Sequence, residues 1–151
     1  MTLAETSVLI TGGAGFIGSH LGNRLMTEGA HVSGLDSYFH ASNAPRKFPV
    51  ENGDVRYEEL VAMRMRNADT VIHLAAAINV DFSHVMPAQA YDINLTGTLN
   101  VLEAARKFDV KVVFASSSEG YGTAQAHAID EKHQLDGQSP YAASKIAADR
   151  A

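Results

Sequence analysis

The segment Thr11-Gly-Gly-Ala-Gly-Phe-Ile-Gly18 constrains the fold of this chain more than any other feature. It joins a short apolar run, residues 7–11, which is typical of a buried strand, to a stretch from Phe16 in which apolar residues recur at helical spacing. Glycines at these positions allow a tight turn, a close approach of a ligand to the backbone, and close packing of the helix on the strand. The turn therefore predicts the first strand–helix unit of a parallel α/β sheet.

The same turn is typical of a pyrophosphate site, because a helix N-terminus offers free N–H groups and the positive end of the helix dipole. Asp36 lies at the end of the next predicted strand, 18 residues past Gly18. A carboxylate there accepts hydrogen bonds from the adenosine ribose and repels a 2′-phosphate, which favours NAD over NADP. The alternatives are a purely structural glycine turn and a strand-end aspartate that caps a turn.

Apolar runs and helical periodicity alternate along the rest of the chain. Strands are expected at 7–11, 31–36, 50–55, 69–75 and 111–115, helices at 16–28, 58–67, 88–108 and from Pro140 to the end, and loops at 37–49 and 116–139. This alternation predicts an α/β fold with a doubly wound parallel sheet of the Rossmann type, in three α/β/α layers. Residues 1–151 are then one NAD-binding domain. Gly97, inside the long predicted helix, indicates close packing or a bend.

Composition excludes several classes of protein. The 151 residues carry a formal net charge of −5, which argues against a nucleic-acid partner. The absence of cysteine excludes disulfides and thiol nucleophiles. No apolar run approaches the ~20 residues of a membrane span and no signal-peptide pattern is present, so we expect a cytoplasmic protein. The seven histidines lack metal-site spacing, so no metal is expected, and His73 is interpreted as a buried core residue.

Two further patterns carry chemistry. Tyr141 and Lys145 stand four residues apart on the last predicted helix and share one face of it. An ammonium group near a phenol stabilises the phenolate, which can take a proton from a substrate hydroxyl. A serine run, residues 116–118, follows the strand at 111–115, and loops in that position bind ligands in open α/β sheets. The alternatives are an exposed helix with a solvated lysine and a polar turn after a strand.

In combination, these motifs resemble the extended short-chain dehydrogenase/reductase superfamily, in particular its NAD-dependent nucleotide-sugar epimerases and dehydratases. The resemblance covers residues 7 to 151. It is carried by elements that occur in order: the glycine turn of residues 11–18, Asp54 in Gly-Asp-Val, His73-Leu-Ala-Ala76, Asn94 in Asn-Leu-Thr-Gly-Thr, Ser116-Ser-Ser-Glu119 and Tyr141-x-x-x-Lys145.

The resemblance implies a role for each matching residue. Tyr141 would be the catalytic base, Lys145 its activator and a contact to the nicotinamide ribose, and Ser117 the hydroxyl beside the substrate. Ser117 is chosen because it stands four residues before Tyr121, where the family places its Ser or Thr. Asn94 would lie at a bend of the long helix near the nicotinamide. The cofactor-binding set is Gly12, Gly15, Phe16, Ile17, Gly18, Asp36, Asp54, Val55, Leu74, Ala75, Ala76, Asn94, Tyr141 and Lys145.

The implied reaction starts with Tyr141 removing a proton from a sugar hydroxyl, at C4, while hydride passes to NAD⁺. Return of the hydride gives an epimerase, loss of water a dehydratase, and loss of a C6 carboxylate a decarboxylase of the UDP-glucuronate type. Glu119 bears on this choice because dehydratases and decarboxylases of the family place an acid there, although it can equally be a turn carboxylate that faces water. A non-catalytic NAD-binding domain is the other reading.

The family's substrate-binding part lies mainly beyond Lys145, and this chain ends six residues later. The chain therefore looks like the cofactor half of a nucleotide-sugar enzyme, truncated after the Tyr–Lys helix. Such an enzyme is expected to be a homodimer.

Overall fold

The computed structural model describes residues 3–151. Its five strands form one parallel sheet in the order β3-β2-β1-β4-β5. The strands are β1 (Ser7–Thr11), β2 (His31–Asp36), β3 (Val50–Asn52), β4 (Thr70–His73) and β5 (Lys111–Phe114). The helices are α1 (Phe16–Thr27), α2 (Glu58–Met65), α3 (Val80–Val85), α4 (Pro87–Tyr91), α5 (Gly97–Phe108) and α6 (Pro140–Asp149), with a π-helical turn η1 (Asp92–Thr96) and a 3-10 turn η2 (Ser118–Tyr121).

The chain divides into two compact units. Among the described residues, the first unit comprises 3–75 and 97–115 and contains the whole sheet with α1, α2 and α5. The second unit comprises residues 76–96 and 116–151 and contains α3, α4, η1, η2 and α6.

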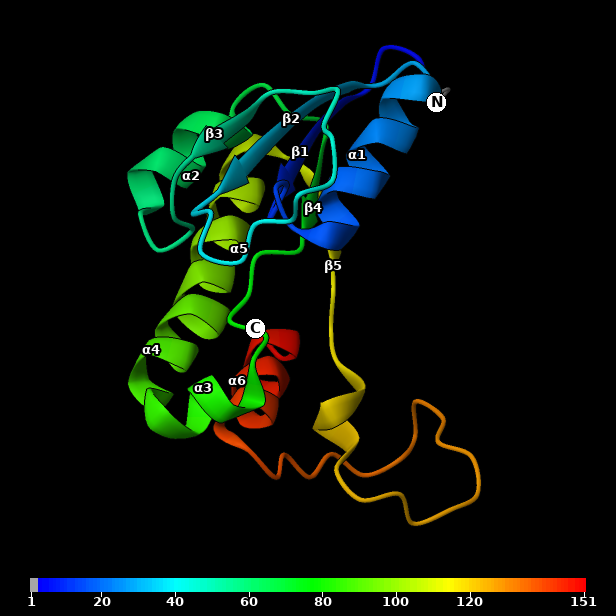
Figure 1. The fold of residues 1–151 in the computed structure, drawn as a ribbon, viewed down its shortest axis with the longest axis vertical. Helices are drawn as coiled ribbons and strands as arrows, with labels where there is room; N and C mark the ends of the chain where they lie inside the picture. The colour runs from blue at the N-terminus through cyan, green and yellow to red at the C-terminus, as the bar shows by residue number, and fades with distance from the viewer. Residues whose placement is uncertain (1–2) are drawn as a thin grey trace. The chain divides into compact units, whose positions relative to one another are not determined.

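Both faces of the sheet in the first unit are covered (Figure 1). Leu9, Leu35 and Val71 alternate with residues of the opposite face and pack in one cluster with side chains of α2 and α5. Val8, Ile10 and Val32 form the other cluster, with Leu25 of α1 and with Phe48 from the loop at 37–49. Alternation within strands that are apolar on both faces is typical of a parallel sheet between two helical layers. The predicted three-layer, doubly wound fold is confirmed.

The positions of the predicted strands are confirmed, with shorter ends at β3, β4 and β5. The single helix predicted over 88–108 is wrong, because α4, η1 and α5 follow one another in its place. The break lies at η1, where the buried side chain of Asn94 bonds to the backbone of Ala77. A π turn adds a residue to the helical ladder and re-aims the side chains on it, which a regular apolar spacing does not reveal.

In the second unit, α6 packs against α3, α4, η1 and η2 (Figure 1). Pro140 at the first position and Ser139, whose Oγ accepts from Ala142 N at 3.0 Å, start α6 as its sequence predicts. The helix α3 was not predicted. Asn79 begins it, with its Oδ1 accepting from Phe82 N at 2.8 Å.

Within residues 3–151, no helix combines the length and the hydropathy that a membrane crossing requires.

Gly97 permits close packing at the start of α5. A Cβ there would lie 2.6 Å from Cγ2 of Val55, a β-branched side chain with little freedom to move. We expect Gly97→Ala to lower the free energy of unfolding by about 1 kcal/mol, because overpacking outweighs the gain in helix propensity. On a Val55→Ala background the same change should be stabilising. A double-mutant cycle by chemical denaturation measures this coupling, and strictly additive effects would contradict the packing role.

Candidate functional site

The glycine turn lies where β1 and β4 end side by side, at the point where the strand order reverses. Gly12 has a φ of 74°, and a Cβ on it would lie 2.8 Å from Ala75 N and from the carbonyl carbon of Leu74. Residue 12 therefore has to be glycine for two reasons, its backbone conformation and the space available to it. Carboxyl ends of strands at such a reversal are where open α/β sheets bind ligands.

The N-terminus of α1 is open. Gly15 is its N-cap, and among residues 3–151 no side chain caps it. Phe16 and Ile17, the first residues of the helix, are 70% and 62% exposed although both are apolar. A Cβ on Gly18 would lie 2.9 Å from Gly13 Cα, so helix and turn touch through backbone. The uncapped amides and the positive helix end are suited to a phosphate-bearing ligand. Such a ligand would also cover the exposed apolar side chains beside them.

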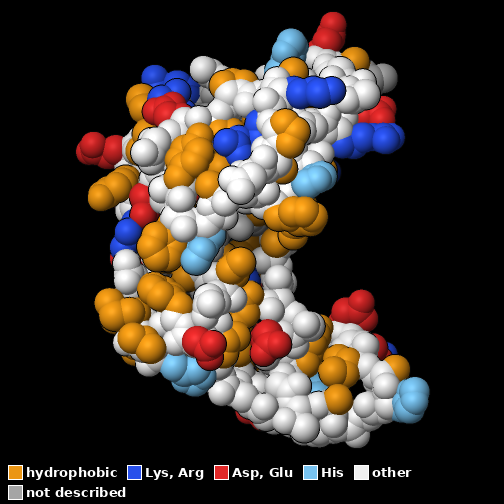
Figure 2. Space-filling model, in the orientation of Figure 1, with side chains coloured by type: hydrophobic (Ala, Val, Ile, Leu, Met, Phe, Trp, Pro, Cys, Tyr) orange, Lys and Arg blue, Asp and Glu red, His pale blue; other side chains and the backbone are white. Residues whose placement is uncertain are grey.

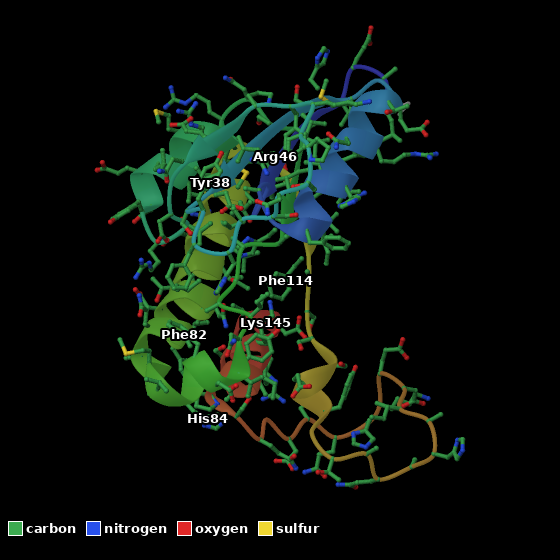
Figure 3. All side chains as sticks on the ribbon, in the orientation of Figure 1. Tyr38, Arg46, Phe82, His84, Phe114 and Lys145 are labelled. Atoms are coloured by element: carbon green, nitrogen blue, oxygen red, sulfur yellow. The ribbon has the colours of Figure 1, made fainter. Side chains whose placement is uncertain are left out.

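Asp36 is held in place by the turn that it faces. Its Oδ2 accepts from Ala14 N at 2.9 Å and its Oδ1 from Tyr38 N at 2.6 Å, and the residue is only 9% exposed. Tyr38 adopts a φ of 60°, and its ring faces the Arg46 guanidinium at 6.0 Å (Figure 3). The carboxylate is thus oriented before any ligand binds, and it also stabilises the loop that follows β2.

His73 is a buried core residue, as predicted. Its Nδ1 forms a 2.5 Å hydrogen bond with Thr11 Oγ1, and its Nε2 a 3.0 Å hydrogen bond with Thr98 Oγ1. Ala75 N in turn donates to Thr11 Oγ1 at 3.3 Å. The imidazole therefore links the ends of β1 and β4 to α5 immediately behind the glycine turn. Within the described part of the chain, no group of three or more acidic or histidine side chains could hold a metal ion.

Asp54 and Val55 follow β3. The Asp54 carboxylate accepts from Arg56 Nη2 at 2.7 Å and from Arg56 N at 2.9 Å. Burial opposes the charge on Asp54, but the hydrogen bonds and the positive charge of Arg56 outweigh it and hold the pKa of that carboxyl below its ordinary value. The Val55 side chain is in the core, and Asn100 Nδ2 donates to the Val55 carbonyl at 3.0 Å.

In the second unit, Asn94 and Ser144 connect the π turn to α6. Asn94 Oδ1 accepts from Ala77 N at 2.7 Å, while its Nδ2 donates to Ser144 Oγ at 2.9 Å. Ser144 Oγ donates to the Tyr141 carbonyl at 2.7 Å. Asn94 lies at a helix irregularity, as predicted, and both side chains are buried. This chain of bonds fixes α6 at the turn that carries Tyr141.

Tyr141 and Lys145 lie one turn apart on α6 (Figure 3 labels Lys145). Tyr141 N donates to Ser83 Oγ of α3 at 3.1 Å. Lys145 is 4% exposed, and burial lowers its pKa to about 8 although the carboxylate of Asp149 acts in the opposite direction. A lysine so close to losing its proton near neutral pH is unusual on a structural helix and common at functional sites.

Glu119 lies on η2 and Ser117 is the N-cap residue before it; η2 packs against α6. Ser117 Oγ accepts from Glu119 N at 3.3 Å and so starts the turn. Gly120 is buried, and a Cβ there would lie 3.2 Å from Ile146 Cγ1 of α6. Glycine at this position lets η2 approach the helix that carries the tyrosine and the lysine. All four predicted catalytic residues lie in the second unit, on α6 or at η2.

The predicted cofactor residues divide between the two units. Those in the first unit are Gly12, Gly15, Phe16, Ile17, Gly18, Asp36, Asp54, Val55, Leu74 and Ala75, and those in the second are Ala76, Asn94, Tyr141 and Lys145. Sequence analysis missed Ser83 and Ser144, which hold the backbone of α6. The cap signal at Asn79 would have revealed α3 and hence Ser83, whereas the partner of Ser144 is 50 residues away in sequence.

We expect one of the five lysines to titrate near pH 8 in the native chain. Its signal should be absent in Lys145→Met, because that variant has no amine at position 145. The folded state binds fewer protons than the unfolded chain between about 8 and 10.5, so this group makes the fold more stable as the pH rises through that range. Nuclear magnetic resonance of isotope-labelled lysine measures the titration, and a normal value for Lys145 would contradict the burial argument.

Comparisons with known proteins agree with the family resemblance. The family model described as GDP-mannose 4,6 dehydratase matches residues 9–151. The UDP-glucose 4-epimerase of Mycolicibacterium smegmatis is 36% identical over 149 residues, which cover 92% of this chain and 48% of the relative. The UDP-glucuronic acid decarboxylase 1 of Xenopus tropicalis is 33% identical over 128 residues, which cover 83% of this chain and 30% of the relative.

Among solved structures, UDP-glucose 4-epimerase from Brucella ovis in complex with NAD matches with a TM-score of 0.90 and 32% identity, over 96% of this chain and 46% of that chain. The present chain spans about half the length of the epimerases that it matches. With the glycine turn, the sheet order and the Tyr–Lys helix in place, the chain belongs to the extended short-chain dehydrogenase/reductase superfamily, in the family described as GDP-mannose 4,6 dehydratase.

Proposed function

We propose that this chain is the cofactor-binding half of an NAD-dependent enzyme that oxidises the sugar of a nucleotide-sugar, with epimerisation at C4 as its reaction. The observation that carries the proposal is the buried Lys145, one turn after Tyr141, in a chain that also has an open glycine turn facing Asp36. A purely structural Rossmann unit has no need to bury a charged lysine beside a tyrosine.

The residues of the first unit fit a dinucleotide. Gly12 and Gly15 leave room at the turn, the uncapped end of α1 would hold the pyrophosphate, and Asp36 would accept hydrogen bonds from the adenosine ribose. Asp54 and Val55 would contact the adenine, and Leu74 and Ala75 would line the remainder of the cofactor. The bound nicotinamide supplies the hydride acceptor of the reaction.

The residues of the second unit would carry the proton transfers. Tyr141 would take the proton of the C4 hydroxyl as general base and return it as general acid. Below about pH 8 the Lys145 ammonium carries the charge that favours the phenolate form of a neighbouring tyrosine. Ser117 would bind the same sugar oxygen, and the bonds of Asn94 and Ser144 would keep α6 oriented. Because the ammonium is lost as pH rises through about 8, turnover should fall on the alkaline side.

The second candidate reaction is decarboxylation or dehydration. The exposed Glu119 favours it, because its carboxylate lies on η2 next to α6 and can move a proton that a 4-epimerase leaves in place. The similarity to UDP-glucuronic acid decarboxylase 1 of Xenopus tropicalis supports this alternative.

The sugar-binding residues belong, in this proposal, to a segment that corresponds to the unmatched half of the relatives. We also propose a homodimer. It is supported by exposed apolar side chains on the α3–α4 segment, with Val85 at 77% and Met86 at 47% exposure (Figure 2 shows orange side chains on this segment). A cytoplasmic location stays a prediction.

NAD should bind this chain at least about tenfold more tightly than NADP, because Asp36 repels a 2′-phosphate. Asp36→Ala should reduce this ratio of affinities and also lower the affinity for NAD. The ribose hydroxyls lose the carboxylate that accepts their hydrogen bonds, and so do Ala14 N and Tyr38 N. Asp130→Ala, at an exposed carboxylate of the second unit, is the matched control. Calorimetry measures both affinities, and equal affinities in the unmodified chain would refute the role of Asp36.

Gly15→Val is the companion variant, because its side chain would occupy the space of the pyrophosphate. NAD binding should be lost while the far-ultraviolet circular dichroism is retained. Undiminished binding would mean that the glycine turn is only structural.

In the full-length enzyme, Tyr141→Phe should lower turnover by about 10²–10⁴-fold while NAD stays bound, because only the acid–base oxygen is removed. Glu119→Gln separates the two candidate reactions. It should leave a 4-epimerase active and cripple a 4,6-dehydratase, which needs a proton removed at C5. The 151-residue chain alone should bind NAD with negligible turnover. Full activity of Tyr141→Phe would remove the tyrosine from the mechanism.

A further inference from the structure

An acidic residue lies in an electrostatically unfavourable place on α6. Asp149 is the last residue of that helix, where the negative end of the helix dipole disfavours a carboxylate. The residue is exposed, yet its Oδ2 accepts a 2.6 Å hydrogen bond from Ser116 Oγ. This hydrogen bond holds the carboxylate beside the end of the helix.

The residue one turn before Asp149 is Lys145. Positions four apart lie on the same face of a helix, and here an acid follows a buried base in that register. Burial drives the lysine towards its neutral form, and the carboxylate of Asp149 is the charge that raises the pKa of the lysine again. The other titratable or charged side chains of α6 and of the elements packed against it are Asp81, His84, Tyr91, Asp92, Glu119, Tyr121, Tyr141 and Arg150.

We propose that Asp149, anchored by Ser116, is a positioning residue for the Lys145 side chain, which lies one turn earlier on the same face of α6. The importance of this pair for catalysis rests on the proposed function, because the ammonium is what favours the phenolate. The anchor also gives the first two serines of the run separate roles: Ser116 holds Asp149, whereas Ser117 begins η2. Without Asp149, burial acts unopposed and the amine loses its proton at lower pH.

The test uses the whole chain and reads the titration of Lys145 by nuclear magnetic resonance with isotope-labelled lysine. Asp149→Asn keeps the shape of the side chain and removes its charge. We expect the titration midpoint of Lys145 to fall by at least about 0.3 pH unit, a shift typical of losing one partly solvated charge pair. The difference between the two midpoints should shrink in 1 M salt. At that concentration the Debye length is about 3 Å, so salt screens the attraction between the exposed carboxylate and the ammonium.

Ser116→Ala tests the anchor separately. It should lower the same midpoint by less than Asp149→Asn does, because the carboxylate is still present but no longer held. Asp149→Glu should restore part of the lost effect. The control is Asp130→Asn, which removes an exposed carboxylate of the same unit. The Asp130 carboxylate accepts a hydrogen bond from Lys132 N at 2.9 Å and so stabilises only a local turn. It should leave the Lys145 titration where it is.

A midpoint in Asp149→Asn equal to that of the Asp130→Asn control would overturn the proposal, as would a shift that salt leaves unchanged. Neither readout depends on NAD or on turnover. Failure of the chain to bind NAD would refute the proposed function and leave the Lys145–Asp149 coupling standing. In the full-length enzyme, Asp149→Asn should move the alkaline limb of the activity profile to lower pH, an effect that a loss of fold alone does not produce.

Discussion

The contact between the ends of β1 and β4 is the constraint on which the first unit depends. Gly12 turns there with a positive φ, and the backbone of residues 74–75 occupies the space that any side chain would need. Thr11 and His73 tie the same two strand ends together beneath the turn. Because this point is also where the strand order reverses, the close contact that holds the sheet also shapes the opening for a ligand.

The second unit depends on a different constraint, the burial of charge on α6. Lys145 is desolvated, and its environment has to compensate for a cost that no surface lysine bears. The backbone of α6 is therefore fixed at several points, by Ser83 at its start and by the Asn94–Ser144 bond at its middle. Rigid placement of a costly group is typical of sites that use it, since a flexible helix would let the ammonium reach water.

Asp36 shows how one side chain joins structure and binding. Its two oxygens orient the glycine turn and the loop after β2, so a variant at this position alters both the fold around the turn and the affinity for a ribose. Asp54 also combines a structural role with a proposed binding role, because its carboxylate already accepts a hydrogen bond from Arg56. Affinity measurements on either residue therefore need a structural control.

The sequence by itself determined the five strands and their order along the chain, the sheet class and the positions of the glycine turn, Asp36 and the Tyr–Lys pair. Those depend on local periodicity and on spacing along one element, which a single chain of letters records. Only the tertiary structure decided that the irregularity at Asn94 is a π turn bonded to Ala77, and that the Val55 side chain leaves no room for a side chain at Gly97. It also decided that Ser116 reaches Asp149, a residue 33 positions away. These three contacts join residues that are distant in sequence. No local pattern specifies which distant side chains come into contact, because tertiary packing determines it.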